Sequence, residues 1–153
     1  MSDSQHTHKI KSGSTSSHLA EQGAITRRKI LGEAYVESTE KSAGELDREL
    51  REISLENIWG RTWSRGILSH QELSMLNLAL MAAMNRMTEF ERHCRTALLN
   101  TKVPPEKIRE LIVHLSVYCG MPVALEAVRV LRCVLQQEGI SEDIFNTSNS
   151  VSD

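Results

Sequence analysis

Apolar residues recur at helical spacing along most of this chain, and no stretch alternates apolar and polar residues between hairpin turns as a strand would. In the stretch TEFERHCRTALLN, residues 88–100, one helix face collects Phe90, Cys94, Ala97 and Leu98. Comparable stripes cover residues 24–42, 43–60, 73–87, 105–119 and 122–138. The pattern therefore predicts an all-α fold with about six helices.

Two of these segments predict how the helices pack. Residues 43–60 form the clearest amphipathic pattern, with Leu46, Leu50, Ile53 and Ile58 expected on a buried face. The segment LSMLNLALMAAMNRM, residues 73–87, is apolar almost all the way round, so it should be covered on most sides. A single small layer of neighbours would not cover it. We therefore expect the helices to assemble a homo-oligomer.

Length and composition predict one globular domain, with 153 residues of which 40% are hydrophobic and 25% charged. We expect a disordered polar tail over residues 1–22, a helical domain over 23–140 and a second polar tail over 141–153. The first tail lacks the apolar core of a signal peptide. His6, His8 and His18 could collect a metal ion only by ordering this tail, so no metal site is expected.

Charge and cysteine content exclude several classes of partner. A net charge of −2, without clustered basic and aromatic residues, argues against nucleic acid as a partner, and no membrane partner is expected. The three cysteines are widely spaced along the sequence, at Cys94, Cys119 and Cys133. An odd number at this spacing predicts reduced thiols in an intracellular, cytoplasmic protein.

Polar residues on apolar helix faces are the remaining candidates for chemistry, because the chain has no glycine-rich phosphate loop, GxSxG, HExxH or CxxC motif. His93 shares the buried face of residues 88–100, where a neutral imidazole could exchange protons or could simply be a core histidine. His114 lies four residues before Tyr118, so the two rings could meet on one helix face, or His114 could make a structural hydrogen bond.

A second group of candidates surrounds Gly66. Trp59 and Trp63 lie four residues apart and could line a pocket or belong to the core. Arg65 could clamp a carboxylate with its planar guanidinium, or could be solvated in a loop. These residue types suit acid–base chemistry without a cofactor, and none is expected.

Three phrases, taken in order and spacing, resemble the carboxymuconolactone decarboxylase family: WGRTWSRGIL (59–68), MNRMTEFERHCRTALLN (84–100) and VPPEKIRELIVHLSVYCGMPVALEA (103–127). RRKILGEAYVE (27–37) is similar to that family's N-terminal region. The resemblance implies an alkylhydroperoxidase-D-like helical fold assembled as trimers or hexamers. It also implies cofactor-free decarboxylation of a carboxylated lactone, with the family's histidine at His93.

The resemblance implies further roles. Arg65 would anchor an anion, while Trp59, Trp63, His114 and Tyr118 would contact the substrate. The peroxidase relatives use a CxxC pair, which residues 87–90 lack, so a thiol peroxidase is disfavoured.

The chain also departs from the family pattern. Arg61 stands where decarboxylases usually carry an acidic residue, Leu73 stands where they carry an arginine, and the usual NNGV is NTKV. A changed charge pattern implies a different substrate, such as a bulkier, less charged cyclic compound. Two functions stay open: a lyase or isomerase acting on a cyclic acid, lactone or enone, and a non-catalytic oligomeric binder of small molecules.

Overall fold

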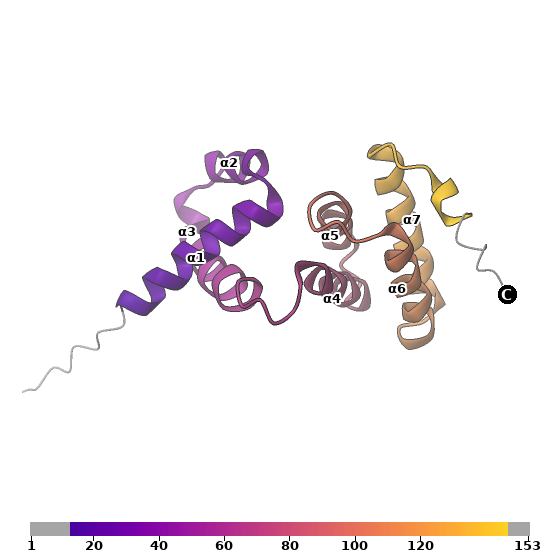
Figure 1. Cartoon of the computed structure of the whole chain (residues 1–153), viewed down its shortest axis with the longest axis horizontal. Helices are drawn as coiled ribbons and strands as arrows, with labels where there is room; N and C mark the ends of the chain where they lie inside the picture. Colours follow the sequence, from indigo (N-terminus) through magenta and orange to yellow (C-terminus); the bar gives the residue numbers. More distant parts are fainter. Residues whose placement is uncertain (1–12, 147–153) are drawn as a thin grey trace, which may run out of the picture. The chain divides into compact units, whose positions relative to one another are not determined.

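The computed structural model describes residues 13–146, which divide into two compact units, one ending at Arg65 and the other beginning at Gly66. Figure 1 labels the seven α-helices of the described residues, and no strand occurs among them. The predicted all-α fold is confirmed. The units are described separately below as unit 1 and unit 2.

Unit 1 begins with two helices, α1 (Gly13–Leu31) and α2 (Glu33–Lys41). The sequence predicts one helix over residues 24–42 interrupted by Gly32, and the chain does break there. Gly32 has a φ of 85°, a left-handed conformation that costs glycine little because it has no Cβ. The helical spacing of Ile30, Leu31, Ala34 and Tyr35 predicts a shared buried face, which is only partly correct, since Ile30 is buried whereas Tyr35 is exposed.

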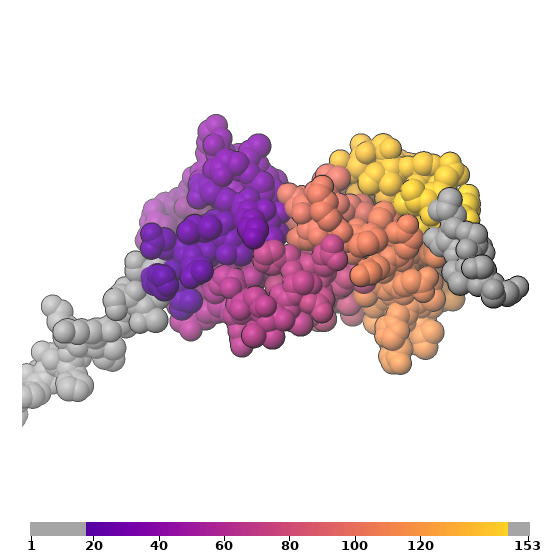
Figure 2. Space-filling model, in the orientation of Figure 1, coloured from indigo at the N-terminus to yellow at the C-terminus, as the bar shows by residue number. Residues whose placement is uncertain are grey.

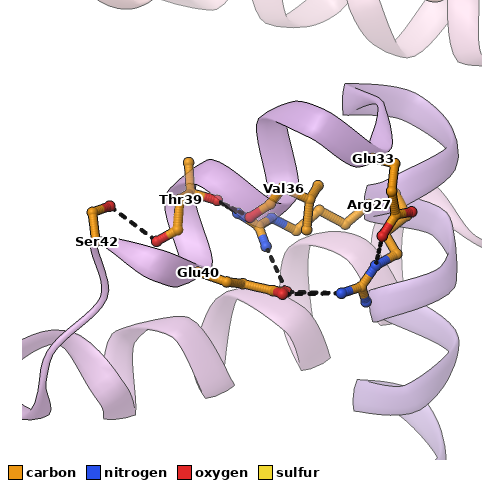
Figure 3. A network of polar contacts seen from close by, with 7 residues as sticks. Arg27, Glu33, Val36, Thr39, Glu40 and Ser42 are labelled. Carbon is orange, nitrogen blue, oxygen red and sulfur yellow. Dashed lines mark hydrogen bonds and ion pairs between the residues drawn. The ribbon is translucent and has the colours of Figure 1, made fainter.

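Polar contacts join α1 to α2, as Figure 3 shows. Arg27 Nη2 donates to Thr39 Oγ1 at 2.7 Å, and Arg28 Nη2 donates to Glu40 Oε2 at 3.0 Å. Arg28 Nε also donates to Glu33 Oε1 at 2.9 Å. Such exposed ion pairs add little stability individually. Together they fix how the two helices meet after the break.

The second half of unit 1 contains a short 3₁₀ helix η1 (Glu45–Asp47), the helix α3 (Arg48–Ile53) and a π-helix η2 (Ser54–Trp63). The buried stripe predicted over residues 43–60 is wrong. Its four members are exposed by 49% or more, namely Leu46, Leu50, Ile53 and Ile58. The chain changes from α to π geometry after Ile53, so α-helical spacing does not describe which residues share a face in η2, where Ile58 lies. The other three residues precede η2 and are not covered by any described element.

Unit 2 contains four helices: α4 (His70–Ala83), α5 (Met87–Leu99), α6 (Pro105–Tyr118) and α7 (Met121–Gln137). Reciprocal hydrogen bonds between Ser69 and Glu72 cap the start of α4. Gly120, with a φ of 94°, separates α6 from α7, as its position between YC and MP predicts.

One hydrophobic core runs through unit 2 and receives side chains from all four helices. The four apolar positions expected on the buried face of α5 are buried. Ile108, Ile112 and Leu115 contribute from α6, and Leu131, Val134 and Leu135 contribute from α7. On α4, Leu76 and Leu80 are exposed by 50% and 53%, so the described residues of a single chain do not cover this helix on all sides.

The predicted tails are also corrected where the structure describes them. Residues 13–22 belong to α1, and residues 142–145 form the 3₁₀ helix η3 (Glu142–Phe145). Arg132 Nε donates to Glu142 Oε1 at 2.8 Å, and the Arg109 guanidinium lies 5.2 Å from the centre of the Phe145 ring. Figure 2 shows the yellow end of the described chain lying on the orange surface of unit 2. The remaining tail residues, His6 and His8 among them, lie outside the described residues.

Within residues 13–146, no helix combines the length and the apolar character that a bilayer crossing requires.

Candidate functional site

His93 lies on α5 at the margin of that helix's buried face, and its side chain is half-buried. Burial removes water from the ring and lowers the pKa of the imidazole below its usual value. The charge of Arg92 lowers this pKa further, whereas Glu89 raises it. The ring is therefore neutral near pH 7, the form in which a histidine accepts a proton.

Charged side chains on the same helix form the electrostatic surroundings of His93. Arg86 Nη2 donates to Glu89 Oε1 at 2.7 Å, and this hydrogen bond is the main reason that the pKa of Glu89 is lowered. Arg92 is exposed and forms no ion pair with a described residue. Arg86 is paired with Glu89, so Arg92 is the charge beside the ring that has no ion-pair partner among the described residues, and it favours a negatively charged ligand there.

Sequence analysis did not single out these three charged residues. The signal was present, because Glu89 lies three residues after Arg86 and four before His93, the spacings at which helix side chains meet.

His114 and Tyr118 form a ring pair on α6, as their spacing predicts. Their ring centres lie 4.3 Å apart with an interplanar angle of 27°, a stacked arrangement. Both residues are exposed, with Tyr118 exposed by 76%. Their stacked rings present a flat face that a planar ligand or another protein surface could cover.

Trp59 and Trp63 form a second ring pair on η2, in unit 1. Their ring centres lie 5.3 Å apart at an angle of 42°. Trp63 is buried, with 4% of its surface exposed, so the core interpretation is correct for this residue. Trp59 is half-buried and keeps part of its surface open to a ligand.

Arg65 follows the tryptophan pair at the end of unit 1. It is exposed and forms no ion pair with the residues that the structure describes. Its guanidinium can therefore bind an anion without first breaking an internal contact. Four of the six predicted site residues thus form two ring pairs. The other two are Arg65, which follows η2, and His93, which lies on α5.

An open groove of about 580 Å³ lies in unit 2 along α4 and α6. Its walls are mostly apolar and its polar groups are Ser69, Gln71, Glu72 and Lys107. Gln71 Nε2 donates to the Lys102 carbonyl at 2.8 Å, and the Glu72 carboxylate accepts a hydrogen bond from the Ser69 amide at the start of α4. No predicted site residue lines this groove, and sequence analysis did not identify it because α4 and α6 are brought together only by folding.

The cysteines do not form a dithiol site. All three are free, and Cys94 is buried, which raises the pKa of its thiol far above the usual value. A thiolate is therefore strongly disfavoured at the cysteine that follows His93.

Between residues 13 and 146, no three histidine, cysteine, aspartate or glutamate side chains lie close enough to share a metal ion.

The sequence model of the carboxymuconolactone decarboxylase family matches residues 52–132. A nitrosuccinic acid decarboxylase of Metarhizium robertsii is 35% identical over 112 residues, which are 73% of this chain and 78% of the relative. The chain belongs to the carboxymuconolactone decarboxylase family. Within this family, a 4-carboxymuconolactone decarboxylase of Acinetobacter baylyi is 29% identical over 125 residues, 82% of this chain and 92% of the relative.

The matched residues of this carboxymuconolactone decarboxylase family member extend from the end of α3 into α7. They contain all six predicted site residues, from Trp59 to Tyr118. Both relatives are named as decarboxylases, although the two names give different substrates.

Proposed function

We propose that this protein is a cofactor-independent decarboxylase in which His93 transfers the proton. The half-buried His93 imidazole, with Glu89 and Arg92 close enough to influence its charge, is the observation that carries the proposal. A histidine in such surroundings changes protonation state easily when an anion binds beside it. The decarboxylase names of both relatives support the same reaction class.

The proposed reaction replaces a carboxylate by a proton. A bound substrate carboxylate stabilises the protonated form of His93, so the ring carries a proton in the complex. The carbon–carbon bond to the carboxylate breaks, carbon dioxide leaves, and the electron pair moves into an adjacent electron-withdrawing group. The imidazolium then gives its proton to the carbon that lost the carboxylate, and water restores the proton to the ring.

The substrate class follows from this electron flow. The leaving carboxylate must lie next to a carbon whose negative charge is delocalised, as into the carbonyl of a lactone or another cyclic compound. Arg61 and Leu73 replace an acidic residue and an arginine of the usual family pattern, which favours a substrate different from 4-carboxymuconolactone. Aromatic catabolism and secondary-metabolite synthesis both contain such compounds.

The other predicted site residues receive binding roles in this proposal. Arg65 anchors a second anionic group of the substrate through its guanidinium. Trp59 and Tyr118 offer partly exposed rings to a cyclic substrate, and Trp63 and His114 hold those rings in their pairs.

We further propose that the protein forms a homo-oligomer, a trimer or hexamer. In unit 2, apolar side chains are exposed at four-residue intervals on two helices: Leu76, Leu80 and Met84 along α4, and Val113, Val117 and Met121 along α6 and into α7. Leu76 and Leu80 share one face of α4, and Val113 and Val117 share one face of α6; another copy of the chain would remove these faces from water.

The function is tested by comparing wild type, His93→Ala and the exposed-residue control His18→Ala on a panel of carboxylated lactones, nitro acids and cyclic enones. Carbon dioxide release and product mass are both measured. Loss of an acid–base group lowers kcat by roughly a hundredfold or more. We expect this loss only for His93→Ala, with its helical circular dichroism unchanged. Equal activity in all three proteins would refute the role of His93.

The pH profile separates the decarboxylase from an isomerase on the same scaffold. If His93 acts as an acid, kcat/KM falls as pH rises above its pKa; if it acts as a base in isomerisation, kcat/KM rises. Binding of panel compounds without any turnover would instead identify a non-catalytic small-molecule binder.

A further inference from the structure

The backbones of α1 and η2 meet directly in unit 1, at two glycines. Gly23 on α1 and Gly60 on η2 are both buried. A Cβ at Gly23 would lie 2.0 Å from the Leu55 carbonyl oxygen, and a Cβ at Gly60 would lie 2.3 Å from the Leu19 carbonyl oxygen. The atoms met are backbone atoms, so a rotamer change does not relieve either clash. We call this contact the glycine crossing.

The glycine crossing lies against the hydrogen-bonded backbone of the π-helix. A Cβ at Gly23 would meet both the Leu55 oxygen and the Gly60 nitrogen, two groups separated by the five-residue interval of a π-helical hydrogen bond. The same interval recurs at the end of η2, where the Ser64 amide donates to the Trp59 carbonyl at 3.0 Å. A side chain at the crossing would therefore push against backbone groups of η2 that have the spacing of a π-helical hydrogen bond.

Both tryptophans of the chain lie on η2: Trp59 directly precedes Gly60, and Trp63 follows it by three residues. Trp63 is buried and contacts Trp59, whose ring centre lies 5.3 Å away. To reach ordinary van der Waals contact, an alanine at either glycine would have to move the helices apart by about 1 Å. The indole of Trp59 would move with the backbone that carries it.

We infer that Gly23 and Gly60 are positioning residues, which place the indole of Trp59 for substrate binding by holding α1 against η2. The inference rests on the proposed function, in which Trp59 contacts the substrate. A displacement of about 1 Å in a binding group can lower kcat/KM by up to roughly a hundredfold. Because Trp59 binds the substrate and takes no part in proton transfer, the loss appears in KM rather than in kcat.

The test compares wild type, Gly23→Ala and Gly60→Ala with the control Gly44→Ala. At Gly44 a Cβ meets no atom within 4 Å, and its φ of −124° suits alanine. The first measurement needs no substrate, because tryptophan emission and the exciton signal of the indole pair in circular dichroism report on η2 alone. The second measurement is KM and kcat on the panel substrate that releases carbon dioxide.

The expected result is a changed emission spectrum, a weaker exciton signal and a KM raised about tenfold or more for both crossing variants, with kcat within about threefold and Gly44→Ala like wild type. Emission and KM like wild type in folded variants would overturn the glycine crossing as a positioning device. A changed emission with unchanged KM would overturn its role in binding. If no panel compound reacts, the proposed function fails separately, while the spectra still decide whether the crossing places the indole.

A double-mutant cycle adds a readout that a purely structural role would not move. If Gly60 acts through the indole, Gly60→Ala changes KM much less in a Trp59→Ala background than in wild type. Equal effects in both backgrounds would refute the proposal.

If an alanine variant loses its helical circular dichroism, hydrogen exchange of the wild type replaces it. The crossing predicts that amides of residues 19–23 and 55–60 open together, with one common rate. Independent opening rates would overturn it.

Discussion

A buried hydroxyl pair links α4 to the loop after α5, and its removal gives the sharpest stability prediction for the unit that carries His93. Ser74 Oγ and Thr101 Oγ1 lie 2.8 Å apart and are 2% and 8% exposed. Thr101 Oγ1 also donates to the Ala97 carbonyl at 3.3 Å. Thr101 thus keeps the Ala97 carbonyl as a partner when Ser74 is replaced, whereas Ser74 loses the Thr101 hydroxyl when Thr101 is replaced.

The two substitutions should therefore differ in cost. Thr101→Val leaves a buried hydroxyl without its partner and lowers the free energy of unfolding by about 1–3 kcal/mol. Ser74→Ala costs about 1 kcal/mol or less. The double variant removes both hydroxyls, so its cost is smaller than the sum by at least about 0.5 kcal/mol.

Urea unfolding followed by circular dichroism measures these differences. With a slope of about 2 kcal/mol/M, Thr101→Val shifts the midpoint by roughly 0.5–1.5 M. Ser116→Ala, at an exposed hydroxyl on α6, is the control and stays within about 0.5 kcal/mol of wild type. Additive costs, or a larger cost for Ser74→Ala, would show that the two hydroxyls do not act as a pair.

Four further predictions concern charge, assembly and thiols. Glu89→Gln should lower the pKa of His93, and Arg92→Gln should raise it. NMR titration of the imidazole measures both changes. If both variants shifted the pKa in the same direction, the opposite effects assigned to Glu89 and Arg92 would be refuted. Because burial lowers the folded-state pKa of His93, the contribution of this residue to stability is fully present above the unfolded pKa of about 6.5 and is lost as pH falls from that value through the lower folded-state pKa. Urea midpoints of wild type should therefore decline more steeply with acidification than those of His93→Gln, and parallel declines would refute this. In sedimentation, wild type should run as an oligomer and Leu80→Glu as a single chain. Wild type that already sediments as a single chain would refute the proposed assembly. Maleimide should modify the exposed Cys133 without loss of turnover, and inactivation would point to thiol chemistry.

The helices of unit 2 were largely predictable because their stripes reflect local periodicity. The four apolar positions of residues 88–100 are buried on α5, and Gly120 separates α6 from α7 as expected. In these helices, α-helical spacing alone decides which side chains share a face.

Unit 1 shows where this reasoning fails. The stripe of Leu46, Leu50, Ile53 and Ile58 has the spacing of a buried face, yet all four are exposed. The chain enters the π-helix η2 at Ser54, and the contact that η2 makes is with α1 through glycines. Hydrophobic periodicity detects apolar faces, but a glycine contact leaves no apolar pattern to detect.

The candidate site divides in the same way. The sequence by itself determined the helical fold, the family and the spacing that stacks His114 on Tyr118, because each depends on residues near in sequence or on the order of motifs. Only the tertiary structure decided that His93 is half-buried and has a lowered pKa, that Trp63 is buried, and that Gly23 meets η2. Desolvation and close backbone contact depend on elements distant in the chain, and helical periodicity carries no information about which of those elements will cover a given face.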